Sequence, residues 1–86
     1  MASFPELQNE QVALVRADIN TGIILEVDYT YAKRPDERVY TVFNNSNDAL
    51  EFGKSIVKER KNIECIIYDN DENMIYYITP DNINSH

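Results

Sequence analysis

The densest group of potential metal-ligating side chains is the segment Asp69-Asn70-Asp71-Glu72-Asn73. An EF-hand loop binds calcium through side-chain oxygens, and its first ligands are carboxylate and amide oxygens at alternate positions. Met74 then stands where that loop requires glycine, and Pro80 stands where it requires a bidentate glutamate. Because Asn and Asp are also the residues that turns prefer, we expect a polar hairpin loop here, with a cation-binding loop as the alternative.

A second pair of carboxylates, Glu26 and Asp28, lies two positions apart and would share one face of a strand. Paired carboxylates perform acid–base chemistry when one of them is desolvated. Thr30 continues the same polar face, so the sequence gives no sign of desolvation. We therefore expect a solvated strand face at these two residues.

The single cysteine, Cys65, lies in an apolar run, and the single histidine, His86, is the last residue. We expect Cys65 to be a small buried hydrophobe, and a terminal histidine is a poor general base because it cannot hold a geometry. With one Cys, one His and two Gly, the chain lacks the residues for a zinc site, a paired nucleophile or a phosphate-binding loop. The sequence therefore predicts a protein that is not an enzyme and uses no cofactor or metal.

Tyrosine is the one remaining residue type whose frequency points to a function. Six tyrosines and no tryptophan occur, and all six fall on predicted strands. Tyrosine suits surfaces that are dry on one side and wet on the other, such as interfaces, although it also favours strands in general. We expect the sheet face without a helix to be a recognition or self-association surface. The candidate binding residues are Glu26, Asp28, Tyr29, Tyr31, Tyr76 and Tyr77.

Length and composition limit the remaining function classes. The 86 residues predict one domain, residues 1–86, with an ordered core over residues 10–80 and polar termini. The net charge of −7 disfavours nucleic-acid binding, because the one basic cluster, Lys58 to Lys61, is short and lies at a helix C-terminus. No stretch approaches the ~20 apolar residues of a membrane span, and no signal peptide is recognisable. We expect a cytoplasmic protein that does not bind membranes.

Alternating polarity and turn residues predict five strands and one helix in the order β-β-β-α-β-β. The helix is expected to begin at Ser46 or Asn47 and to stop at Asn62, with Gly53 on its apolar stripe approaching the sheet closely. Phe4 and Leu7 are expected to be able to dock on the core as a short helical turn. The predicted strands are residues 11–18, 23–31, 38–43, 63–69 and 74–79, with a charged loop at residues 32–37.

One apolar helix stripe covers only one face of one sheet. The sequence therefore predicts an α+β fold with a single, mostly antiparallel five-stranded sheet and one helix packed on one face. Pairing of the last strand beside the first would give the strand order 3-2-1-5-4.

Size and charge together predict a non-catalytic, acidic protein-binding or regulatory module. An inhibitor or immunity-type protein that masks a basic partner is one version, and self-association is the other form of protein binding that we consider. The alternative is a small-ligand or cation-binding sensor that uses the carboxylates of Asp69, Asp71 and Glu72.

Overall fold

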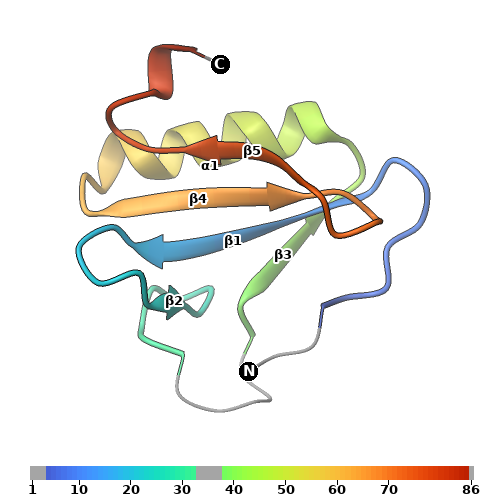
Figure 1. The fold of residues 1–86 in the computed structure, drawn as a ribbon, viewed down its shortest axis with the longest axis horizontal. Coiled ribbons are helices and arrows are strands. Elements are labelled where there is room, and N and C mark those ends of the chain that lie inside the picture. Colours follow the sequence, from blue (N-terminus) through green and yellow to red (C-terminus); the bar gives the residue numbers. More distant parts are fainter. Residues whose placement is uncertain (1–3, 33–37, 86) are drawn as a thin grey trace.

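The computed structural model describes residues 4–32 and 38–85. Most of the predicted loop at residues 32–37 and His86 lie outside the described residues. The elements follow the predicted order (Figure 1). They are β1 (Val12–Asp18), β2 (Ile24–Leu25), β3 (Tyr40–Phe43), α1 (Ser46–Glu59), β4 (Ile63–Tyr68), β5 (Met74–Ile78) and a short 3₁₀ helix, η1 (Ile83–Ser85).

One open, antiparallel five-stranded sheet contains all the strands, which confirms the predicted α+β fold. β1 lies at its centre and pairs along one side with β4, which in turn pairs with β5. Along its other side, β1 pairs with β3 at its N-terminal half and with β2 at its C-terminal end (Figure 1).

The strand order 3-2-1-5-4 is wrong, because β4 rather than β5 lies beside β1, and β3 also pairs directly with β1. β4 carries buried side chains on both of its faces, at Cys65 and Ile66 for example. An interior position buries both faces of such a strand. In β5 only Ile78 is buried, which suits the edge of the sheet.

The strand predicted over residues 23–31 is also wrong beyond Leu25. Residues 26–30 form a turn in which the Glu26 amide donates to the Thr30 carbonyl at 2.8 Å. The Asp28 carboxylate accepts from the Thr30 amide at 3.1 Å and from its hydroxyl at 2.7 Å. An aspartate that bonds the backbone two residues ahead stabilises a turn in place of a strand, whatever the alternation of polarity.

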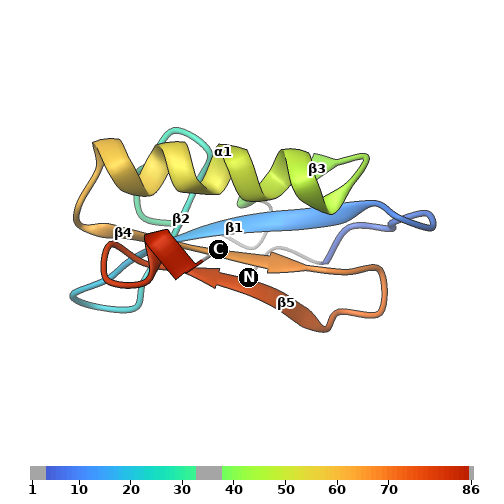
Figure 2. The ribbon, with the colours of Figure 1, turned by 90° about the horizontal axis from the view of Figure 1, so that it is seen from above.

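Helix α1 packs across one face of the sheet, as Figure 2 shows edge-on. Its N-cap is Asn45, one residue before the predicted start, and the Asn45 side chain accepts from the Asp48 amide at 2.8 Å. The helix ends at Glu59 with Arg60 as its C-cap, so the predicted stop at Asn62 is slightly late.

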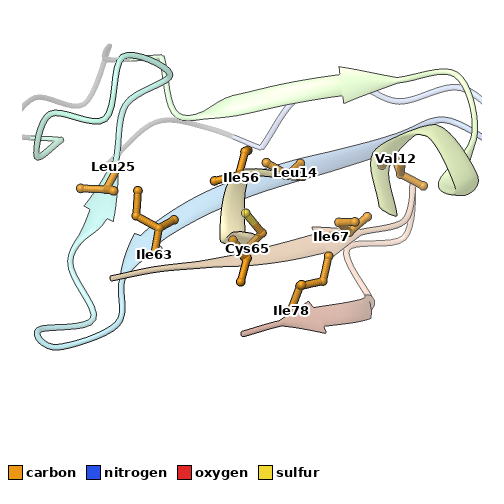
Figure 3. Packing of buried hydrophobic residues seen from close by; sticks show 10 residues of the cluster. Val12, Leu14, Leu25, Ile56, Ile63, Cys65, Ile67 and Ile78 are labelled. Carbon is orange, nitrogen blue, oxygen red and sulfur yellow. The ribbon is translucent and has the colours of Figure 1, made fainter. Parts of the chain in front are cut away.

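The core between helix and sheet is a single apolar cluster (Figure 3). Gly53 approaches this cluster closely, as predicted. A Cβ atom built on Gly53 would lie 2.7 Å from Ile78 Cδ1 and 3.3 Å from Leu14 Cδ1. The buried members of the cluster are Val12, Leu14, Leu25, Ala49, Ile56, Val57, Ile63, Cys65, Ile67 and Ile78.

The Gly53 contact gives a first prediction. Gly53→Val should lower the free energy of unfolding by about 1–3 kcal/mol, because the added methyl groups overpack the core. Valine has a higher helix propensity than glycine, and this difference offsets part of the expected loss of stability. Ser55→Val, on the exposed side of α1, should change the free energy of unfolding by less than about 0.5 kcal/mol. Urea unfolding followed by circular dichroism measures both, and equal effects would contradict close packing at Gly53.

Candidate functional site

The sheet face opposite α1, called here the helix-free face, is built from cross-strand rows of side chains. Strand alternation and register place Tyr40, Val15, Ile66 and Tyr77 side by side in one row across β3, β1, β4 and β5. A second row contains Val42, Ala13, Tyr68 and Met74. A third row contains Ile24, Ala17 and Glu64.

Phe4 packs onto this face between β3 and β4. Its ring centroid lies 5.4 Å from that of Tyr40 and 6.0 Å from that of Tyr68, edge-to-face in both cases. Such pairs contribute about 0.5–1.5 kcal/mol each beyond their buried area. Phe4 therefore docks as expected, but on the helix-free side and without a helical turn.

The helix-free face has a buried centre and an exposed apolar rim. Val15 and Ile66 are 4% and 9% exposed, whereas Val42 and Tyr77 are 44% and 43% exposed. Met74, opposite Tyr68 at the sheet edge, is 60% exposed. Exposed apolar patches mark protein–protein interaction sites, where aromatic residues and methionine are enriched.

The charge on this face is negative. The Tyr77 hydroxyl donates to Glu64 Oε1 at 2.6 Å, and this hydrogen bond raises the pKa of Tyr77. Burial, with smaller contributions from Tyr68 and Glu72, raises the pKa of Tyr40. Tyr40 and Tyr77 are thus neutral hydrogen-bonding groups at physiological pH. The three rows contain no lysine or arginine.

The structure separates the residues that the sequence grouped as binding candidates. Tyr77 lies on the helix-free face, whereas Tyr76 and Tyr29 pack against the core on the helix side. Tyr31 is exposed and donates its hydroxyl proton to Asp18. Glu26 and Asp28 lie in the turn at residues 26–30 and share no strand face with the tyrosines.

Sequence reasoning did not include Tyr40, Tyr68 and Glu64 among the binding candidates. For Glu64 and Tyr68 the signal was present in the alternation of residues 63–68, which puts Glu64, Ile66 and Tyr68 on one face of a single strand. This alternation was hard to recognise because the strand carries apolar residues on both of its faces around Ile66.

A buried arginine lies on the helix side of β1. Arg16 is 3% exposed, and its guanidinium carbon lies 5.6 Å from the ring centroid of Tyr29 and 5.5 Å from that of Phe52. Its Nη1 donates to Thr41 Oγ1 at 3.0 Å, while its Nε has no acceptor. Arg60 lies over the same tyrosine, 3.9 Å from the ring centroid. The two cations therefore hold Tyr29 in place by cation–π contacts.

A surface pocket of about 390 Å³ opens beside this cluster, at the C-terminal end of α1. Asp18, which lies in its wall, accepts from the Asn20 amide at 2.8 Å and from the Tyr31 hydroxyl at 2.9 Å. These hydrogen bonds hold the pKa of Asp18 below its usual value, so the carboxylate is ionised at neutral pH. The pocket is lined by Asp18, Leu25, Tyr29, Thr30, Tyr31, Arg60, Asn62 and Ile63.

The acidic segment at residues 69–73 is a hairpin loop, as predicted. The Asp69 carboxylate accepts from the amides of Asn73 and Asp71, both at 2.9 Å, and these bonds lower the pKa of Asp69. Glu72 adopts a left-handed backbone conformation with φ of 62°. In the part of the chain that the structure describes, no three His, Cys, Asp or Glu side chains are grouped so that they could hold a metal ion.

Cys65 is a fully buried thiol in the core, as predicted. Burial raises its pKa to about 12, and the nearby Arg16 lowers it only in part. The thiol therefore stays protonated and is not a nucleophile at neutral pH.

This burial gives a second prediction. At about pH 8, where an ordinary thiol is partly ionised, a thiol-labelling reagent should modify native Cys65 at least tenfold more slowly than the urea-unfolded chain. Because the pKa is higher in the folded state, Cys65 contributes to stability below the unfolded pKa, and this contribution is lost as the pH rises toward 12. Rapid labelling without denaturant would show that the thiol is accessible.

Comparison with models of protein families, with curated proteins and with solved structures finds no match for this chain. None of the helices in the described residues is long and apolar enough to cross a membrane.

Proposed function

We propose that the protein is a non-catalytic, cytoplasmic protein-binding module that uses its helix-free face to bind a partner presenting lysine or arginine. The observation that carries this proposal is the row Tyr40–Val15–Ile66–Tyr77, flanked by Glu64 and free of basic residues. A more specific form of this proposal is an inhibitor or immunity-type protein that covers a basic surface of its partner.

The chemistry of the face supports a basic partner. Tyrosine rings attract guanidinium and ammonium groups by cation–π interaction, worth about 0.5–2 kcal/mol according to how far the contact is desolvated. Glu64 and Glu72 supply negative charge close to those rings. The net charge of −7 would also speed association with a basic protein, since long-range attraction raises association rates.

Self-association is the less favoured form of protein binding. Two copies would each bring a net charge of −7 to the complex. Like-charge juxtaposition opposes docking, and no basic side chain in the three rows offsets it.

The third prediction concerns partner binding. An affinity-tagged protein should recover one stoichiometric protein from nuclease-treated lysate of the native host, with less recovered at high salt because screening weakens the charge contacts. Glu64→Lys and Tyr77→Ala should each weaken the purified complex at least tenfold, or about 1.4 kcal/mol. Mass spectrometry identifies the partner, and calorimetry measures the affinities.

Glu59→Lys is the matched control for charge, because it makes the same change on the exposed side of α1. It should alter affinity far less than Glu64→Lys does. If the two charge reversals weaken binding equally, only the net charge matters and the helix-free face is not the site. Absence of a protein partner at both salt concentrations would remove the proposal.

A further inference from the structure

The pocket at the C-terminal end of α1 holds two opposite charges that do not neutralise one another. Asp18 and Arg60 both line it, yet they form no ion pair within 4.0 Å. Among the described residues, the ion pair within that distance is Lys54–Glu51, at 3.7 Å on the helix surface. The separation of Asp18 from Arg60 leaves room for a ligand between a fixed anion and a fixed cation.

The anion is already oriented. Asp18 is only 9% exposed, and its two carboxylate oxygens are held by the Asn20 amide and the Tyr31 hydroxyl. Each oxygen of an ionised carboxylate has a second lone pair, so Asp18 can still accept hydrogen bonds from a ligand ammonium group. Its lowered pKa keeps it charged at neutral pH.

The cation is also oriented. Arg60 stacks on the Tyr29 ring at 3.9 Å, and its amide caps α1 through the Ile56 carbonyl at 2.8 Å. A guanidinium group presents planar donors that match a carboxylate. Tyr29 has a φ of 72°, which is uncommon for a bulky residue, and such strain clusters at ligand sites.

Two apolar and two polar uncharged side chains complete part of the pocket lining. Leu25 and Ile63 belong to the core cluster, while Thr30 and Asn62 contribute polar side chains to the lining. A few placed polar groups around an apolar surface are typical of small-molecule sites, and the volume of about 390 Å³ lies within their usual range.

We propose that this pocket binds a small zwitterion of the amino-acid type. Its ammonium group pairs with Asp18, its carboxylate pairs with Arg60, and an apolar side chain lies on Leu25 and Ile63. A ligand with only a positive charge is repelled by Arg60, and one with only a negative charge is repelled by Asp18. The pocket lies on the helix side of the sheet, so this site is independent of the interaction face proposed above.

The fourth prediction tests the pocket with L-leucine, followed by ¹⁵N-resolved NMR of the full chain. L-leucine should cause saturable shifts of the Thr30, Asn62 and Ile63 amides. N-acetyl-L-leucine, which lacks the ammonium charge, and L-leucinamide, which lacks the carboxylate, should each bind at least tenfold more weakly. These analogues test both charges without any change to the protein.

A pair of variants completes the test. Arg60→Gln should weaken L-leucine binding at least tenfold, whereas Lys61→Gln, the adjacent cation that does not line the pocket, should leave it unchanged. The proposal is overturned if L-leucine and its two analogues bind alike, if both variants behave alike, or if no saturable shift occurs up to the solubility limit. Shifts confined to residues of the helix-free face would also overturn it.

Discussion

The close packing of α1 on the sheet at Gly53 governs how the other elements are arranged. At Gly53 the helix backbone lies so near the sheet that a Cβ atom would displace Ile78, crowd Leu14 and lie in van der Waals contact with Cys65. These three residues belong to β5, β1 and β4, so one point on the helix fixes its position over three strands. The contact also determines which sheet face the helix covers and which face it leaves uncovered.

The second constraint is the interruption of the sheet beside β1. β3 and β2 together pair along the same side of β1, and residues 26–30 fold into a turn between them in the chain. Arg16 lies at this level of the sheet, buried without a carboxylate partner among the described residues. Burial of a charge is unfavourable, but the rings of Tyr29 and Phe52 and the hydroxyl of Thr41 offset part of that cost. The arginine therefore links the turn to the helix.

Because α1 and the turn at residues 26–30 lie on one side of the sheet, the two faces of the sheet differ in chemistry. On the helix-free face, three tyrosines and Glu64 lie around a buried apolar centre formed by Val15 and Ile66. On the helix side, the turn at residues 26–30 and the end of α1 enclose a small concave site that contains both charges. The two proposed sites share no side chain.

Local periodicity was enough to predict the α+β class, the helix, four of the five strands and the burial of Cys65 and Gly53. It failed at residues 26–30, where the Asp28 side chain bonds to Thr30 and favours a turn over the strand that alternation suggested. The tertiary structure alone sets the strand order, because that order depends on burying both faces of β4. It alone joined Asp18, Tyr29 and Arg60 into one pocket, and Tyr40, Tyr68 and Tyr77 on one face. Residues so far apart in the chain meet through sheet pairing and helix packing, which local sequence patterns do not encode.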